Sequence, residues 1–146
     1  MGSTIAWFGL AVTLGLSSMP AFSNTLHFQA DLKGANEVAL SDSSGVGTVD
    51  ATYDNISKKF SWTIVYSRLT DPATAVEFDG PAGAEAVAPS VITLRGGLES
   101  PIQGDSSLTD PEALNLQTGR WYLNIYSAKY PAGEIRGQLN EEFDNK

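Results

Sequence analysis

Two alternating segments near the C-terminus constrain the fold most strongly, and together they read WYLNIYSAKYPAGEIRGQL over residues 121–139. In the first segment Trp121, Leu123 and Ile125 alternate with polar or amphipathic side chains, as a strand with one apolar face requires. A Pro-Ala-Gly sequence supplies a turn before the second segment, in which Gly137 lets another backbone or a bulky ring come close. These features predict a β-hairpin whose two edges need neighbouring strands.

The rest of the chain contains further short segments with the same two-residue period. The clearest one places Phe60, Trp62 and Ile64 on one face, and we expect Trp62 and Trp121 to be the largest side chains of the core. Strands are predicted at 26–32, 45–53, 60–69, 75–79, 91–94 and 102–108. Because a turn at 54–57 joins two of them, they should form a second hairpin. The pattern predicts an all-β fold, an antiparallel β-sandwich or barrel of about eight strands.

One helix is expected, and the segments outside the strands are polar or small. Thr109-Asp110-Pro111-Glu112 is a capping-box sequence with a proline in the first turn, and it predicts a short helix that ends at Gly119. Residues 34–44 are expected to form a structured polar connection, residues 82–90 a loop, and residues 141–146 a frayed charged tail.

The first 23 residues resemble an export signal. An apolar run at 5–16 is followed by small residues, and Ala21 and Ser23 have the spacing that a signal peptidase recognises. The run is too short to span a bilayer comfortably, and the start is atypical because no lysine or arginine precedes Lys33. We therefore expect a signal peptide at 1–23 and a single domain at 24–146, secreted or periplasmic, with no transmembrane segment in the mature chain.

Composition limits the possible partners and chemistry. The formal net charge of −8 argues against nucleic acid and anionic membranes, and it favours neutral, basic or cationic partners. The chain has no cysteine, which excludes thiol catalysis and thiolate metal sites. Its single histidine, His27, falls on the polar face of a predicted strand, where it is expected to be an ordinary solvated side chain.

No catalytic pattern is evident, so the sequence predicts a protein that is not an enzyme and needs no cofactor. No serine or threonine lies near a plausible base, and no phosphate-binding glycine loop opens a helix. Glu77 and Asp79 are two apart on one predicted strand face, where they should sit side by side rather than flank a sugar. A solvated acidic strand end is the favoured interpretation of this pair.

Aromatic side chains offer a possible binding surface. Tyr122, Tyr126 and Tyr130 fall on or near the predicted wet face of the hairpin, where their rings could stack on a sugar or a protein partner. Tyrosines on strands also serve cross-strand packing, so that alternative stays open. Arg136 lies on the same polar face between Glu134 and a glutamine, and it is expected to be a structural ion-pair residue rather than an anion receptor.

Four stretches carry a resemblance to a known family: ADLKGANEV, SSGVGTVDATYD, FSWTIVYSRLTDPATAVEFDGPAG and WYLNIYSAKYPAGEIRGQL. They resemble the CHRD domain, the module named after chordin and also found alone in exported microbial proteins, from about residue 26 to residue 139. The resemblance implies an immunoglobulin-like or superoxide-dismutase-like β-sandwich that is exported and has no established catalytic activity.

This sequence departs from the family pattern at three positions. Many members are similar to H-x-H-G-P where this chain has Glu77-Phe78-Asp79-Gly80-Pro81, and to N-I-H where it has Asn124-Ile125-Tyr126. The resemblance implies that Glu77, Asp79 and Tyr126 lie close together, since a shared site would explain histidines at all three places. Two carboxylates and a phenol favour hard cations over copper or zinc, so we expect weak cation binding at most and no bound transition metal.

The sequence thus predicts an exported, non-catalytic binding or structural module of the cell envelope or extracellular space, whose partner is an unidentified protein or glycan of the envelope. The alternatives are a carbohydrate-binding or weak cation-binding protein. A superoxide-dismutase-like metalloenzyme is less favoured, because that chemistry needs several imidazoles. Asn55-Ile56-Ser57 also matches the N-glycosylation acceptor pattern, which matters only in a eukaryotic secretory route.

Overall fold

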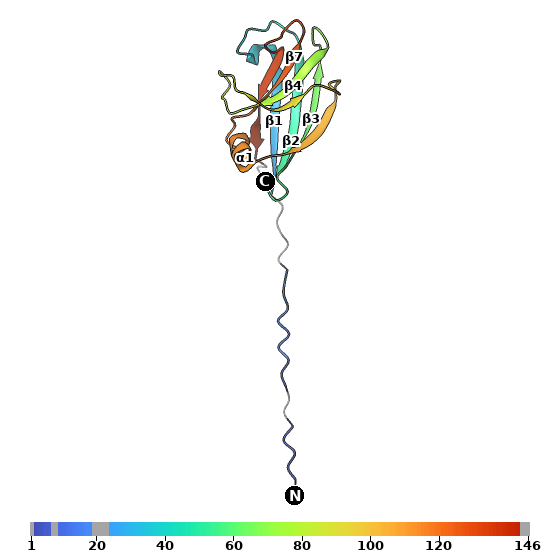
Figure 1. The fold of residues 1–146 in the computed structure, drawn as a ribbon, viewed down its shortest axis with the longest axis vertical. Helices are drawn as coiled ribbons and strands as arrows, with labels where there is room; N and C mark the ends of the chain where they lie inside the picture. The colour runs from blue at the N-terminus through green and yellow to red at the C-terminus, as the bar shows by residue number, and fades with distance from the viewer. Residues whose placement is uncertain (1, 7–8, 19–23, 144–146) are drawn as a thin grey trace.

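The computed structural model describes residues 2–6, 9–18 and 24–143. The predicted cleavage site after Ser23 lies outside the described residues. Residues 2–6 and 9–18 are exposed, contain no helix or strand, and extend away from the sheet (Figure 1). Among the described residues, none of the helices has the length and apolar character needed to cross a membrane.

Residues 25–142 fold into one antiparallel sheet with a short helix at its side (Figure 1). The strands are β1 (Thr25–Lys33), β2 (Val46–Asp54), β3 (Lys59–Ser67), β4 (Ala73–Asp79), β5 (Ser90–Leu94), β6 (Ile102–Ser107), β7 (Tyr122–Ser127), β8 (Ile135–Gln138) and β9 (Asn140–Glu142). The helices are the 3-10 turn η1 (Gly34–Asn36) and α1 (Asp110–Gln117). The strand order is β5-β4-β7-β8-β1-β2-β3-β6, and β9 pairs with β1. The all-β class is confirmed.

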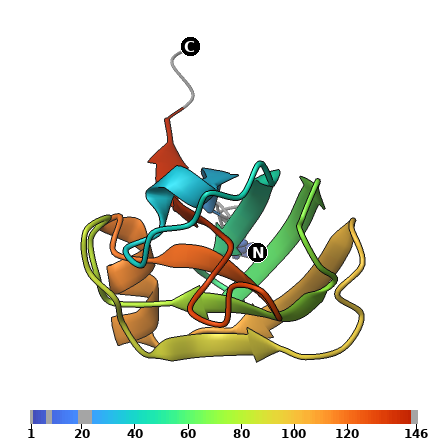
Figure 2. The ribbon, with the colours of Figure 1, turned by 90° about the horizontal axis from the view of Figure 1, so that it is seen from above.

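The two halves of this sheet curl over one another and enclose the core (Figure 2). Rings from β3 and β4, which lie in different halves, meet in the interior. The ring centroids of Phe60 and Phe78 are 5.2 Å apart in an edge-on arrangement, and those of Trp62 and Phe78 are 5.1 Å apart. The sandwich is therefore a single curled sheet, whose two facing layers remain joined through β8 and β1.

The predicted hairpin of residues 121–139 is confirmed and lies in the middle of the sheet. β7 pairs with β8 and also with β4, while β8 approaches β1. Leu123 and Ile125 are fully buried on the inner face. Gly137 permits the close approach that its position predicted, because a Cβ there would lie only 2.3 Å from the backbone oxygen of Asp31.

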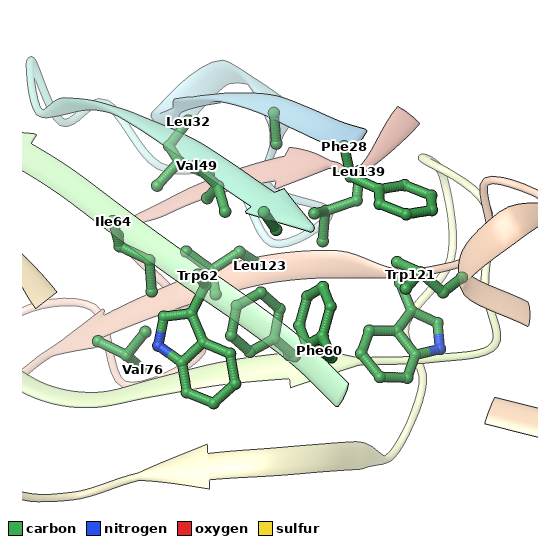
Figure 3. Packing of buried hydrophobic residues seen from close by; sticks show 14 of the residues in the cluster. Phe28, Leu32, Val49, Phe60, Trp62, Ile64, Val76, Trp121, Leu123 and Leu139 are labelled. Carbon is green, nitrogen blue, oxygen red and sulfur yellow. The ribbon is translucent and has the colours of Figure 1, made fainter. Parts of the chain in front are cut away.

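Both predicted tryptophans belong to the aromatic centre of the core (Figure 3). Trp121 is fully buried, and Trp62 is 6% exposed. Glycines make room for both rings, since a Cβ at Gly80 or at Gly104 would lie 2.6 Å from an atom of Trp121 or of Trp62, respectively. The core thus depends on pairing the largest side chains with the smallest residue.

The predicted second hairpin and helix are also confirmed. β2 and β3 pair along their whole length around a turn in which Asp54 Oδ1 accepts hydrogen bonds from two backbone N–H groups. The capping box is formed, with Thr109 and Glu112 each hydrogen-bonded to the backbone of the other. Gly119 follows α1 with a φ of +72°.

The expectation of a frayed tail at 141–146 was wrong for its first residues. Asn140–Glu142 form β9 and pair with residues 27–29 of β1. Residues 144–146 lie outside the description. The charged composition of this segment concealed the strand because β9 is short and largely exposed, so its backbone pairing leaves no apolar pattern in the sequence.

Candidate functional site

The candidate site lies on the outer face of β4, β7 and β8, opposite the core. Neighbouring strands place Glu77 of β4 beside Asn124 of β7, and Asn124 beside Arg136 of β8. In a neighbouring cross-strand pair, Asp79 of β4 lies opposite Tyr122 of β7. Polar side chains from three strands are therefore assembled on one surface by the period of the sheet.

This outer face is covered rather than wet, which corrects the sequence-based expectation. Tyr122 is 2% exposed and Asn124 is 4% exposed. The loop at 82–89, which ends one residue earlier than predicted because Ser90 begins β5, lies over the face and is fixed there by hydrogen bonds: Ala88 N–H donates to the Tyr122 hydroxyl at 2.9 Å, and Gln138 Nε2 donates to the Ala82 carbonyl at 2.8 Å. The sequence could not show this cover, because a small-residue loop has no periodic pattern of its own.

Arg136 holds that loop in place. Its Nη2 donates to the carbonyl oxygens of Gly83 and Ala86 at 3.0 and 2.7 Å, and its Cζ lies 3.4 Å from the centroid of the Tyr122 ring. The side chain is 1% exposed. The predicted ion pair is not found among the described residues. The Arg136 guanidinium instead donates to two backbone carbonyl oxygens and makes a cation–π contact.

Asp79 does not belong to a solvated acidic strand end, as the sequence pattern indicated. It is 1% exposed, and its Oδ1 has no hydrogen-bond partner. Burial raises the pKa of this carboxyl to about 6, and the nearby charge of Glu77 adds to the rise, while hydrogen bonds from Tyr122 and Ser90 and the charge of Arg136 oppose it. Glu77 itself is only half-buried.

Glu37 is a site residue that the sequence reasoning did not single out. It follows η1, where its backbone N–H donates to the Gly34 carbonyl at 3.0 Å, and it is 7% exposed. Burial raises the pKa of its carboxyl to about 7, against the lowering effects of Arg136 and of a hydrogen bond with Asn124. A glutamate in a polar connection carries no sequence signal of burial.

Gly133 provides the space in which Glu37 and Asn124 meet. A Cβ at this position would lie 2.6 Å from both Glu37 Oε1 and Asn124 Oδ1, and its φ of +122° also favours glycine. Neither of these two oxygens has a hydrogen-bond partner outside the Glu37–Asn124 pair. The cluster therefore holds several acceptor oxygens without donors, which is unusual for buried polar atoms.

Glu77, Asp79 and Tyr126 lie close together, as the family resemblance implied. The pKa of the half-buried Tyr126 phenol is raised by burial, then by the charges of Asp79 and Glu77, and by a hydrogen bond with Glu77. Glu77 and Tyr126 also line a hollow of about 440 Å³ together with Arg95. No group of three or more His, Cys, Asp or Glu side chains placed to hold a metal ion occurs in the described part of the chain.

The three tyrosines do not form one exposed platform. Tyr122 is buried beneath Arg136, Tyr126 contacts Glu77, and the Tyr130 hydroxyl donates to Asp42 on the loop before β2. Only Tyr126 and Tyr130 are partly exposed. Stacking of one ligand across all three rings, which the alternation suggested, does not fit this arrangement.

A larger hollow of about 750 Å³ adjoins the buried cluster. Arg136 and Gln138 of β8 line it together with residues of β1, of β9, of the segment 35–38 at η1 and of the loop that covers the outer face. Its volume falls in the range of small-molecule sites. We call this hollow, which lies against Ala30, Glu37, Arg136 and Gln138, the β1–β8 pocket.

Fold and site together define an all-β module made of one curled antiparallel sheet, with a covered polar cluster on its outer face. A family model described as the CHRD domain matches residues 28–139. The chain therefore belongs to the CHRD domain family, as its sequence motifs indicated. Neither the curated proteins nor the solved structures contain a match to it.

Proposed function

We propose that this protein is an exported, non-catalytic binding module of the cell envelope or extracellular space. The observation that carries the proposal is the β1–β8 pocket, which has a ligand-sized volume and borders a buried polar cluster. Preformed concave sites with a few fixed polar groups are typical of ligand binding. The hydrogen bonds that the Arg136 side chain donates to Gly83 and Ala86 support a preformed pocket, because they fix the loop that forms one of its walls.

We also propose that the protein catalyses no reaction, because its polar side chains already have structural roles. Arg136 is engaged with two carbonyl oxygens and a tyrosine ring, and the hydroxyl of Tyr122 accepts a backbone hydrogen bond. His27 is exposed on β1, where it pairs with Thr52 and Glu142. These side chains support the architecture rather than a proton-transfer relay.

Export is proposed from the signal-like sequence of residues 1–23 and from membership of the CHRD family. The partner would be a protein or glycan of the envelope.

Weak cation binding or carbohydrate binding is the second candidate function. The hollow beside Glu77 and Tyr126 favours it, since a phenol ring and a carboxylate suit both ligands. A superoxide-dismutase-like activity would require imidazole ligands at these positions.

Capture of partners from the native envelope tests the proposal. Ala84 lines the pocket and is exposed, so Ala84→Trp should fill the opening, while Ala132→Trp adds the same ring in the exposed turn between β7 and β8. We expect the immobilised protein and the Ala132→Trp variant to retain the same partner, and the Ala84→Trp variant to lose it. Equal capture by all three proteins would contradict binding at this pocket.

A screen for hydrolase and oxidase activity tests the non-catalytic part. We expect no turnover above the level of a buffer blank. Activity that is abolished by Glu77→Gln with Asp79→Asn would overturn this part of the proposal, because those substitutions keep the size of both side chains and remove their charge.

A further inference from the structure

We propose that the β1–β8 pocket binds a neutral oligosaccharide. This inference rests on the proposed function and chooses the glycan between the two classes of partner named there. The pocket has a volume of about 750 Å³, its walls are hydrogen-bonded to its floor, and its exposed side chains both donate and accept hydrogen bonds.

The floor of the pocket is the outer face of β1 and of the consecutive strands β8 and β9. Gln29 lies directly opposite Asn140, and Glu142 lies opposite His27, four residues from Asp31. Gln29, Asp31, Asn140 and Glu142 are all exposed, and all four line the pocket. Because alternate residues of a strand share one face, these side chains form a row about 13 Å long. A row of this length accommodates a short oligosaccharide.

Both walls of the pocket are fastened to that floor. The segment at η1 is held by Asn36, whose Nδ2 donates to the carbonyl oxygens of Asp31 at 3.3 Å and of Arg136 at 2.9 Å. The loop at 82–89 is held by Arg136 Nη2 and by Gln138 Nε2, which donate to its carbonyl oxygens. A site that is fixed before its ligand arrives loses little conformational entropy on binding. The pocket is therefore preorganised.

The two amides on the floor point to hydroxyl groups as the ligand chemistry. Gln29 Nε2 donates to Asp50 at 3.0 Å, and Asn140 Nδ2 donates to the Gln138 carbonyl at 3.5 Å, so each amide keeps a second N–H for a ligand. Each amide also has a carbonyl acceptor. A hydroxyl both donates and accepts, whereas an ammonium only donates and a carboxylate only accepts. The lining therefore matches hydroxyls better than an organic cation or an anion.

Carboxylates at the pocket select against acidic glycans. Asp31, Glu85 and Glu142 are exposed lining residues, and each can accept hydrogen bonds from sugar hydroxyls. A uronic acid, a sialic acid or a sulfate would lie beside these like charges, which Coulomb repulsion opposes. Arg136 also lines the pocket, but it is only 1% exposed and offers little surface to an anion. The ligand is therefore a neutral glycan.

The apolar part of the lining is small. Ala35, Val38 and Ala84 are exposed there and can contact the C–H groups of a sugar ring, and none of the described lining residues is aromatic. Without a stacking ring, binding depends on hydrogen bonds, whose individual net contributions are modest. Several linked sugar units must therefore bind together, and affinity should rise with the length of the oligosaccharide.

A glycan array tests the class of ligand. The purified protein is applied to neutral oligosaccharides and to acidic ones that carry uronic acid, sialic acid or sulfate. We expect binding to neutral members only, stronger for longer chains of the same sugar and little changed by added salt, since a neutral ligand has no charge to be screened. Binding to acidic members only, or to no glycan, would overturn the inference.

Paired variants place the binding in the pocket. Gln29→Ala with Asn140→Ala removes two exposed amides of the floor, whereas Asn55→Ala with Gln103→Ala removes two exposed amides outside the pocket. We expect the first pair to weaken binding of the neutral glycan about tenfold or more and the second pair to change it less than about twofold. An unchanged urea midpoint shows that each variant is folded. Equal effects of the two pairs would overturn the inference.

Chemical treatment of the native envelope separates this inference from the proposed function. Mild periodate cleaves the vicinal diols of sugar rings, and protease removes protein partners. We expect capture by the immobilised protein to be lost after periodate and to remain after protease. If capture survives periodate and is still abolished by Ala84→Trp, the glycan inference fails but the proposed function stands. Capture that Ala84→Trp leaves unchanged would overturn the proposed function and this inference with it.

Discussion

Two buried carboxyls of the site, those of Glu37 and Asp79, change ionisation near neutral pH. The pKa of Glu37 is raised to about 7 and that of Asp79 to about 6, and burial is the largest cause for each. A carboxyl with a raised pKa keeps its proton in the folded state at a pH where the unfolded chain has lost it. Both residues therefore favour the folded state at acidic rather than neutral pH.

Glu37→Gln should remove one part of this pH dependence, because an amide of the same shape does not ionise. The unfolded carboxyl loses its proton near 4.5 and the folded one near 7, so wild-type stability should fall relative to the variant as pH rises across that interval. A difference of about 1–3 kcal/mol between pH 4.5 and pH 8 is expected. Urea unfolding at both pH values measures it.

Glu99→Gln is the matched control, since Glu99 is exposed and outside the site. The stability of this variant should follow that of the wild type at both pH values. A wild type that gains stability relative to Glu37→Gln as pH rises would contradict the assigned direction of the Glu37 pKa.

Histidines at three outer-face positions should create a transition-metal site. Glu77, Asp79 and Tyr126 lie close together, and imidazole nitrogens are better ligands for copper and zinc than carboxylates or a phenol. We expect the combined change Glu77→His, Asp79→His and Tyr126→His to bind either metal more tightly than the wild type in calorimetric titrations. Tight copper binding by the wild type would contradict the claim that two carboxylates and a phenol bind copper poorly. An unchanged affinity in the variant would contradict the claim that the three side chains lie close enough to share one metal ion.

At the scale of strands and their packing, Trp121 connects the central hairpin to the opposite layer. Its ring lies edge-on to Phe60 of β3 with a centroid separation of 5.5 Å, and it is fully buried against Gly80. Trp121→Ala should lower the free energy of unfolding by about 3–5 kcal/mol, since it leaves a large cavity in a closely packed core. Urea denaturation monitored by circular dichroism measures the loss, and a value below about 1 kcal/mol would contradict this packing.

The elements themselves were largely predictable from sequence because their signals are local. Alternation of apolar and polar residues at 60–69 and 121–125 predicted β3 and β7, and the capping box predicted α1. Burial of the outer face was not predictable, because it depends on a loop far along the chain that binds Arg136. Glu37 was missed for the same reason: its environment is made by Asn124 and Gly133, which are distant in sequence.

For the whole molecule, the topology places the last hairpin between segments from the first and middle parts of the chain. β8 lies beside β1, and β7 lies beside β4, so the sheet is complete only when the C-terminal residues have joined it. The candidate site likewise needs segments from both ends of the chain, since Glu37 after η1 and residues of β4, β7 and β8 contribute to it. Truncation before β7 would remove both the site and the centre of the sheet.

The position of β1 predicts that removal of the first 23 residues leaves the folded domain intact. β1 begins at Thr25, and the Asn24 carbonyl still accepts a hydrogen bond from Asn55 N–H at 3.4 Å. Residues 2–6 and 9–18 are exposed, so their loss removes no core contact among the described residues. We therefore expect the chain that starts at Asn24 to show the same strand-dominated circular dichroism spectrum and the same urea midpoint as the full chain. Intact-mass measurement of exported protein should give a start near Asn24, and an exported chain that retains Met1 would contradict the signal-peptide assignment.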